Sequence, residues 1–488
     1  MALRATGVSK RFGAVRANDD VSVEIARGTI HAIVGENGAG KSTLLHILYG
    51  ELRADAGRLE IGGADVDLAA HDPAGAIGRG VGLVHQHFML VPTLTVAENV
   101  VLGREPRRGL VIDLARAERE IAAQATAADL SVDPRRRVAE LSVGEQQRVE
   151  ILKALWRGAD ILLLDEPTAV LSPPEVKELF RVLLALRDAG KTVVLVTHKL
   201  DEVATLADAT TVMRGGRVAA ALPRGTSAAD IACAVVGGSE VPVLPERAHA
   251  ERGSTLLAVE DLAAGRLAGV SLEVRAGEIV GVAGVQGNGQ SELVLAVAGL
   301  LIPDRGRVRL RGADVTGASV AARLAGGIGH IPEDRHRRAM ILGFGLADNL
   351  RLGRQREVGH GGLDAWARAR LEAADVRPPE PAAPMSSLSG GNQQKLVVER
   401  ELGRPGLALL LAAEPTRGVD IGAAAAIHRR IAAAAAAGAG VLLVSSDLTE
   451  LRALSDRLLV FFRGRIAASL PPDASDERLG ALMTGAAA

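Results

Sequence analysis

The sequence predicts an α/β protein in which one domain type occurs twice, each copy with parallel strands and a helical insertion. Two observations predict this fold class. Sequence landmarks recur in one order at a nearly constant spacing, and short apolar runs alternate with helical stretches. A third observation, a glycine-rich loop between a strand and a helix, predicts a phosphate site in the first copy. The 488 residues also exceed the size of one ordinary domain.

The duplication appears in four pairs of landmarks, offset by 247 to 249 residues. Lys41 corresponds to Gln290. The segments LSVGEQQ, LLLDEPT and LVTHKLDE of the first half correspond to LSGGNQQ, LLAAEPT and LVSSDLTE of the second. We therefore expect one domain over residues 1–240, a short polar linker that contains proline over 241–254, and a second domain over 255–488.

Local patterns predict the elements of each half. The runs TIHAIVG, DILLLDE and TVVLVTH are short, apolar and bounded by loops, as buried parallel strands are. The stretch from about 95 to 157, between the first two runs, is expected to be mostly helical. A further helix is predicted after Ser172, a suitable N-cap, with Pro173 at its first position and Gly190 beyond its end. Residues 431–444 predict an alanine-rich helix, a glycine stop and a buried strand.

Composition and charge exclude several classes of protein. The net charge of -1 gives no support to nucleic-acid binding. A single cysteine, Cys233, excludes a disulfide framework and a cysteine-cluster zinc site. The first residues lack the apolar core of a signal peptide, and the most apolar run, 431–444, is too short to cross a bilayer. The sequence therefore predicts a soluble intracellular chain that reaches a membrane only through partners.

The first half contains a complete phosphate loop, GENGAGKS, at 35–42. Glycines let backbone N–H groups turn toward phosphate oxygens, and the helix that follows favours anions at its N-terminus. Lys41 is expected to reach the β- and γ-phosphates, and the Ser42 hydroxyl to bind Mg²⁺.

Three further side chains close the neighbouring strands. Asp165 and Glu166 end the run ILLL, where one carboxylate can hold Mg²⁺ and the other can orient the attacking water. His198 closes the third strand, at the edge where α/β sheets place ligands. Alone, each would be an ordinary strand end, but beside a phosphate loop we interpret them as catalytic. His85 and His87 also suggest a metal pair, which we disfavour because the sequence offers no third ligand.

The segments LSVGEQQ and LSGGNQQ resemble the signature motif of ABC-type ATPases, and with the phosphate loop and strand-end acids the resemblance covers nearly the whole chain. It implies two tandem ABC-type P-loop ATPase domains, each with a helical subdomain. It also implies ATP and Mg²⁺ as cofactors, and two composite sites. Each ATP is held by the phosphate loop of one half and the signature of the other half.

The resemblance assigns a role to each residue of the first composite site. Phe12 stacks on adenine, Glu166 polarises the water and His198 contacts the γ-phosphate. Gln86 senses Mg²⁺ and the membrane partner. The expected catalytic residues are Lys41, Gln86, Glu166 and His198; the metal ligands are Ser42, Gln86 and Asp165; and the nucleotide contacts are Phe12, Gly35, Glu36, Asn37, Gly38, Ala39, Gly40, Lys41, Ser42 and Thr43, with Ser389, Gly390, Gly391 and Asp420 from the second half.

The second composite site lacks most of these groups. Gln290, Ala413 and Ser446 replace the lysine, the aspartate and the histidine, and residues 259–270 offer no aromatic ring. In the first-half motifs that face it, Val143 replaces a glycine and Ser172 replaces an acid. Glu414 remains, but general-base help alone is worth only ~10²–10⁴-fold. We expect one ATP to be hydrolysed per cycle, at the first site.

The fused pair resembles the ATP-binding subunit of bacterial simple-sugar importers. Three stretches, 81–103, 284–293 and 329–340, resemble the nucleoside branch, which works with a lipoprotein receptor of the basic-membrane-protein type. The resemblance implies two membrane permease partners, an indirect receptor partner, no nucleic acid and a peripheral place on the cytoplasmic face of the membrane. One alternative is a ribose or galactose importer. Another is a soluble tandem ATPase acting on ribosomes or DNA, which the broken second site and the short linker disfavour.

Overall fold

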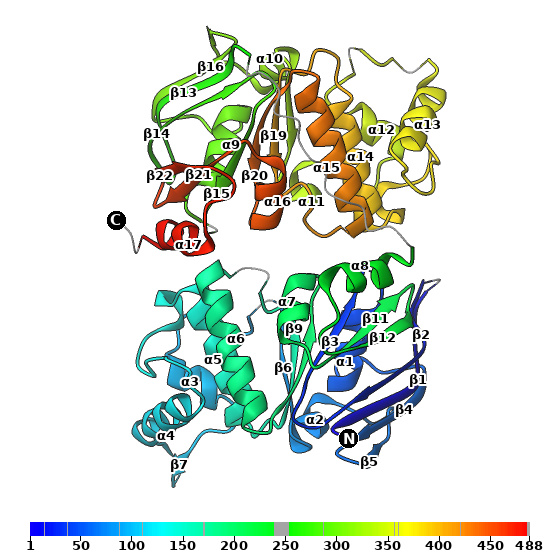
Figure 1. Ribbon diagram of the computed structural model, residues 1–488, viewed down its shortest axis with the longest axis vertical. Coiled ribbons are helices and arrows are strands. Elements are labelled where there is room, and N and C mark those ends of the chain that lie inside the picture. Colours follow the sequence, from blue (N-terminus) through cyan, green and yellow to red (C-terminus); the bar gives the residue numbers. More distant parts are fainter. Residues whose placement is uncertain are drawn as a thin grey trace. The chain divides into compact units, whose positions relative to one another are not determined.

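A computed structural model describes residues 1–13, 15–36, 38–86, 88–109, 111–168, 171–238, 253–285, 287–355, 357–359, 361–419 and 421–485. By its internal contacts the chain divides into two compact units, Met1–Val241 and Pro242–Ala488, and each is described by itself (Figure 1). Across the described part of the chain, every helix is too short or too polar to span a membrane.

The elements of the first unit are β1 Leu3–Phe12, β2 Val15–Ile25, β3 Ile30–Gly35, α1 Lys41–Tyr49, β4 Ala56–Ile61, β5 Ala64–Val66, α2 Pro73–Gly78, β6 Val81–Val84, α3 Val96–Val101, β7 Arg107–Arg108, β8 Val111–Ile112, α4 Leu114–Ala127, η1 Val138–Glu140, α5 Val143–Trp156, β9 Ile161–Asp165, α6 Pro173–Asp188, β10 Thr192–Val196, α7 Leu200–Leu206, β11 Ala209–Arg214, β12 Arg217–Pro223 and α8 Ala228–Val236.

The described elements of the second unit follow the same order, except that α11 is added after β18 and the pair β7 and β8 has no counterpart among them: β13 Thr255–Ala264, β14 Leu267–Arg275, β15 Ile279–Ala283, α9 Gln290–Ala298, β16 Arg305–Leu310, β17 Ala313–Asp314, α10 Val320–Ala325, β18 Ile328–Ile331, α11 Arg335–Arg338, α12 Leu346–Arg351, α13 Leu363–Ala373, η2 Met385–Ser387, α14 Gly390–Leu402, β19 Leu409–Ala413, α15 Ile421–Ala436, β20 Gly440–Val444, α16 Leu448–Leu454, β21 Arg457–Phe462, β22 Arg465–Leu470 and α17 Asp476–Thr484.

Each unit is built around one six-stranded sheet. In the first unit the order is β12-β11-β3-β10-β9-β6, and in the second the equivalent strands follow as β22-β21-β15-β20-β19-β18. All neighbours are parallel except β11 with β12 and β21 with β22. In the first unit, an antiparallel sheet containing β1, β2 and β4 lies toward one side and the helices α3–α5 toward the other (Figure 1). The predicted α/β class and helical insertion are confirmed.

The parallel strands are apolar throughout because both faces of the sheet are covered. In β9, Leu162 and Leu164 pack with the helical subdomain, while Ile161 and Leu163 face the cluster that contains α1. The same alternation appears in β19 of the second unit, where Leu410 packs on one side and Leu411 on the other. The two faces of each sheet therefore pack against separate apolar clusters. The polar residues of the predicted site lie instead at the carboxyl ends of the strands.

The helix predicted after Ser172 is confirmed as α6, with Ser172 at the N-cap in a capping box and Pro173 first. The alanine-rich stretch is confirmed as helix α15, a glycine in the left-handed region at Gly438, and strand β20. Residues 241–252 of the expected linker lie outside the described residues.

One buried asparagine in each unit holds the loop that leads into the helical subdomain. The Asn99 side chain accepts from the Val91 N–H at 2.7 Å and donates to the carbonyls of Val91 and Thr95 at 3.1 and 3.0 Å. Asn349 makes the same bonds to the backbone of Ile341 and Gly345 in the second unit. One amide thus satisfies several backbone groups at once, which orders a loop that lacks regular structure.

We expect Asn99→Ala to loosen this loop, because the backbone groups that it satisfies lose their partners. The expected cost is about 1–3 kcal/mol in the free energy of unfolding of the first unit. Hydrogen–deuterium exchange of the amides from Met89 to Val101 should speed up while β9 keeps its protection. Arg119→Ala, an exposed change on α4, is the control. Unchanged exchange in Asn99→Ala would contradict the role of the amide.

Candidate active site

The phosphate loop connects β3 to α1 and requires glycine at its end. Gly40 is the N-cap of α1 with φ of 94°, in the left-handed region. A Cβ atom at this position would lie 2.0 Å from the Ala17 carbonyl oxygen. Any larger residue would therefore clash and be strained. The glycine lets the first turn of α1 start against β2, with its N–H groups open to an anion.

Lys41 is buried beneath this loop. Its ammonium donates to the carbonyls of Gly35 and Glu36 at 2.8 and 3.0 Å, and only 6% of the residue is exposed. Burial lowers the pKa of Lys41, and the carboxylates of Glu166 and Asp165 act in the opposite direction. The side chain is thus held inside the loop, where a cation meets bound phosphate.

Asp165 lies where the predicted metal ligand should be. The Ser42 hydroxyl donates to its Oδ1 at 3.1 Å, so the first turn of α1 and the end of β9 present adjacent oxygens. Burial raises the pKa of Asp165, and the Ser42 hydrogen bond opposes that rise. A hydroxyl and a carboxylate are ligands that Mg²⁺ prefers, and a cation there would offset the cost of burying the acid.

Glu166 follows β9 and contacts residues that follow two other strands, Gln86 after β6 and His198 after β10. Its carboxylate accepts from the Gln86 amide at 3.2 Å and pairs with His198 Nδ1 at 3.1 Å. Its backbone has φ of 46°, unusual for a residue other than glycine and typical of strain at functional sites. Burial raises the pKa of Glu166, but the hydrogen bond and charge of His198, with Lys41 and Lys199, outweigh it, and the net shift is downward. The acid is therefore ionised and able to accept a proton.

Two histidines beside this site share one glutamate as their hydrogen-bond partner. His46 of α1 and His85 both hydrogen-bond to Glu51, at 2.6 and 2.8 Å. The sequence suggests His85 and His87 as a metal pair without a third ligand, but His87 lies outside the described residues, and the structure instead brings ligand atoms of His46, Glu51 and His85 within 4.8 Å of one another. The two hydrogen bonds of Glu51 already pair these groups, and they tie the residue before Gln86 to the helix that carries Lys41.

The remaining residues of the predicted site are distributed as follows. Phe12 ends β1 and is 48% exposed, with the Lys10 ammonium 5.6 Å from its ring centroid. In the second unit Ser389 is the N-cap of α14, and Gly390 and Gly391 are the first two residues of that helix. Gly38, Ala39 and Thr43 lie on the loop and on α1. Asn37, His87 and Asp420 lie outside the described residues.

The second unit keeps the scaffold with different chemistry. The Gln290 amide donates to the Val285 carbonyl at 3.2 Å, much as Lys41 does in its own loop, but without a charge. The Ser291 hydroxyl donates to Glu333 at 2.5 Å, where Ser42 in the first unit donates to Asp165. Glu333 follows β18 as Gln86 follows β6, so Glu333 holds the position in the second unit that corresponds to Gln86 in the first.

Glu414 repeats the backbone of Glu166 but not its charge state. Its φ is 48°, and it accepts from the amide and hydroxyl of Ser446 at 2.7 and 3.0 Å. Burial raises the pKa of Glu414 to about 7, with a further rise from Glu450, while the Ser446 hydrogen bonds oppose it. Ser446 occupies the position that His198 has beside Glu166, and its hydroxyl supplies no positive charge. Near neutral pH a large share of Glu414 is protonated and unsuited to act as a base.

Comparison with known proteins identifies the family of this chain. The family model described as ABC transporter matches residues 18–169 and 267–417, one match in each unit. The nucleoside import ATP-binding protein NupA of Lactococcus lactis subsp. cremoris is 41% identical over 98% of this chain and 97% of its own length. The guanosine import ATP-binding protein NupO of Bacillus subtilis is 42% identical over 98% of this chain and 96% of its own. The ribose import ATP-binding protein RbsA 1 of Streptomyces avermitilis is 42% identical over 96% and 91%.

The chain therefore belongs to the ABC transporter family, and within it to the tandem ATP-binding import proteins, which are ATPases. The expected tandem ABC-type P-loop ATPase fold is confirmed. Archaeal ribosome recycling factor aABCE1, solved with the ribosomal stalk protein aP1, matches with a TM-score of 0.62 at 20% identity, covering 98% of this chain and 92% of that one. At this identity the match shows the shared fold and carries nothing about ribosomes.

The raised pKa of Glu414 predicts a pH-dependent stability. The folded chain holds a proton that an unfolded glutamate releases above its ordinary pKa of 4.5, so stability falls as the pH rises toward about 7. Glu414→Gln should remove this loss, making the variant more stable than the wild type at pH 8.5 by about 1–3 kcal/mol and equal to it at pH 4.

Calorimetric midpoints of the nucleotide-free chain at the two pH values measure the effect. Glu166→Gln is the matched control, for which no gain is expected because the pKa of Glu166 is lowered. An equal difference between wild type and Glu414→Gln at both pH values would show that folding does not raise the pKa of Glu414.

Proposed function

We propose that this chain is the motor of a nucleoside importer and hydrolyses one ATP per cycle. The observation that carries the proposal is the cluster in the first unit, where Glu166 is bound by Gln86 and His198 beside the Ser42–Asp165 pair. Mg²⁺–ATP would be held by the loop 35–43, with Ser42, Asp165 and Gln86 around the metal. Lys41 would neutralise the phosphates, and Glu166 would polarise the water.

The signature of the second unit would complete this site. Ser389, Gly390 and Gly391 stand at the N-terminus of α14, where N–H groups and the helix dipole favour a phosphate. The first unit is then the catalytic domain. The second unit supplies a degenerate site, in which Gln290, Ala413 and Ser446 remove the groups that stabilise the transferring phosphoryl.

Nucleosides are proposed as the substrate class on two grounds. The stretches 81–103, 284–293 and 329–340 resemble the nucleoside branch, and two relatives at 41% and 42% identity are a nucleoside and a guanosine import protein. A ribose import protein is equally similar, at 42% identity, so sugars are the alternative substrate class. The substrate itself would pass through the partner permeases, and a lipoprotein receptor would deliver it.

Each unit offers an apolar surface for a permease. After Gln86 the side chains of Met89 and Val91 are 62% and 39% exposed, and after Glu333 those of Ile341 and Phe344 are 42% and 47% exposed. Both segments are held in place by Asn99 or Asn349. Exposed apolar side chains beside the residue that contacts Glu166 suit a partner that signals to the site. Two permeases would hold the chain at the cytoplasmic face of the membrane.

The two glutamates test the asymmetry directly. Glu166→Gln should lower the ATPase rate of the assembled complex by at least 100-fold, because the ionised base is lost. Glu414→Gln, the same change at the equivalent position, should leave the rate within about twofold, since a large share of Glu414 is protonated near pH 7 and Ser446 stands where His198 assists Glu166. Comparable losses in the two variants would contradict a single hydrolytic site.

Uptake tests the substrate. Cells that express this chain with its permeases and receptor should take up labelled adenosine, and Lys41→Ala should abolish the uptake because the phosphates lose their cation. Excess unlabelled guanosine should compete and excess ribose should not. Competition by ribose alone would transfer the proposal to sugar import, and lysine-independent uptake would remove this chain as the motor.

A further inference from the structure

Three side chains of the first unit form a cluster that the proposed hydrolysis does not use. His46 lies on α1, Glu51 follows that helix and His85 follows β6. His46 Nδ1 and His85 Nε2 lie 2.6 and 2.8 Å from the two carboxylate oxygens of Glu51. One ligand atom from each of the three lies within 4.8 Å of the others. Among the residues that the structure describes, no second group of three or more histidine, cysteine, aspartate or glutamate side chains comes this close together.

The backbone brings these three side chains together. Gly50 ends α1 with φ of 85°, in the left-handed region, and a Cβ atom there would lie 2.6 Å from the backbone of Asp72. The chain therefore turns back, and the N–H of Glu51 donates to the His46 carbonyl at 2.9 Å. Parallel pairing of β6 with β9 fixes the strand end that His85 follows. The three ligands are thus positioned by the end of a helix and the end of a strand.

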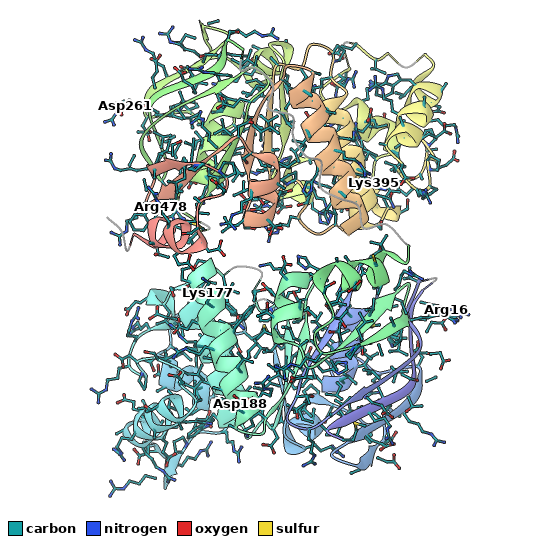
Figure 2. All side chains as sticks on the ribbon, viewed as in Figure 1. Arg16, Lys177, Asp188, Asp261, Lys395 and Arg478 are labelled. Carbon is teal, nitrogen blue, oxygen red and sulfur yellow. The ribbon has the colours of Figure 1, made fainter. Side chains whose placement is uncertain are left out.

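The cluster differs from the ordinary ion pairs of this unit. Most of those join arginine or lysine to a carboxylate, as at Arg16, labelled in Figure 2, which lies 3.3 Å from Asp19. A guanidinium has no lone pair to offer a metal, whereas a neutral imidazole has one. Two imidazoles and a carboxylate form a ligand set of zinc sites in which a fourth position stays open for water. Mg²⁺ prefers oxygen ligands, so the cluster suits a different class of cation from the Ser42–Asp165 pair.

The distances within the cluster suit such an ion after a short movement of the side chains. Nitrogen and oxygen ligands lie about 2.0–2.2 Å from zinc, so two ligand atoms on one tetrahedral ion are about 3.3 Å apart. The hydrogen-bonded pairs at 2.6 and 2.8 Å would open by less than about 1 Å, and their protons would leave to solvent. The side chains of His46, Glu51 and His85 are 27%, 31% and 25% exposed, so an ion can reach them.

Two contacts connect the cluster to the site of hydrolysis. His46 Nε2, the ring nitrogen that does not bond within the cluster, lies 4.0 Å from Asp165 Oδ2. His85 is followed directly by Gln86, whose amide donates to Glu166 at 3.2 Å. A divalent ion on the cluster would add positive charge close to the acid that we expect to hold Mg²⁺, and it would fix the residue before Gln86. Both effects oppose hydrolysis.

The corresponding positions of the second unit carry none of these ligands. Leu295 and Leu300 stand at the positions of His46 and Glu51, and Pro332 stands at that of His85. Neither leucine nor proline has a side chain that binds a metal. The three ligands therefore accompany the complete catalytic cluster and are lost with it, which agrees with an effect on hydrolysis.

We propose that His46, Glu51 and His85 form a binding site for one divalent transition-metal ion of the zinc class, and that the filled site slows ATP hydrolysis. The binding depends only on side chains of the first unit. The effect on hydrolysis rests on the proposed function, because it acts through Asp165 and Gln86. The chain would thus respond to a transition metal separately from the Mg²⁺ that accompanies ATP.

Titration of Zn²⁺ into the nucleotide-free full chain tests the binding. We expect calorimetry to show one tightly bound zinc ion in the parent, and an affinity at least about 100-fold weaker in His85→Asn and in Glu51→Gln, because each loses a direct ligand. Zinc should also raise the thermal midpoint of the parent more than those of the two variants. His336→Asn is the matched control, since this exposed histidine of the second unit lies outside the cluster, and it should bind zinc as the parent does.

Hydrolysis by the complex assembled with the partner permeases, in excess Mg²⁺–ATP, tests the effect. Zinc buffered at about ten times the dissociation constant of the parent should lower the parent rate at least about threefold and leave the rate of His85→Asn nearly unchanged. A chelator should restore the parent rate.

Three results would overturn the inference: no tight zinc ion in the parent, equal zinc affinity in the parent and both variants, or unslowed hydrolysis by the parent with zinc bound. Failure of the proposed function has a separate sign, which is ATP hydrolysis at the full rate by Glu166→Gln in the absence of zinc. Zinc binding by the nucleotide-free chain does not depend on that result.

Discussion

The site depends on one end of each sheet, where the carboxyl ends of its parallel strands lie together. Strands β3, β10, β9 and β6 are neighbours, and each ends in a residue or loop that carries chemistry. Because parallel strands present their carboxyl ends together, Lys41, His198, Glu166 and Gln86 meet although more than 150 residues separate the first from the second. Burial of both faces of the sheet fixes the positions of these strand ends. The charges of the few side chains at the strand ends then determine the chemistry of the site.

The two units share this arrangement of strands but differ in the charges of the side chains that the strands carry. In the first, Lys41 is hydrogen-bonded within its loop, Asp165 accepts from Ser42, and Glu166 pairs with His198. The charges of His198 and Lys41 favour the ionised form of Glu166. In the second, the lysine and the histidine are replaced by neutral groups and Glu414 retains a proton to about pH 7. The backbone φ is nearly the same at Glu166, 46°, and at Glu414, 48°, so the difference between these two acids comes from the side chains around them.

The sequence by itself determined the duplication, the α/β class, the complete phosphate loop and the losses at Gln290, Ala413 and Ser446, because these depend on residue type and local spacing. It also predicted Ser172 as a helix cap. Only the tertiary structure decided that Glu175 caps α6 and α5 together, that Glu51 joins His46 to His85, and that Ser291 turns to Glu333. These contacts join elements far apart along the chain, and the state of Glu414 depends on its burial. Local sequence patterns contain neither distance nor burial, which the packing of helices on the sheet decides.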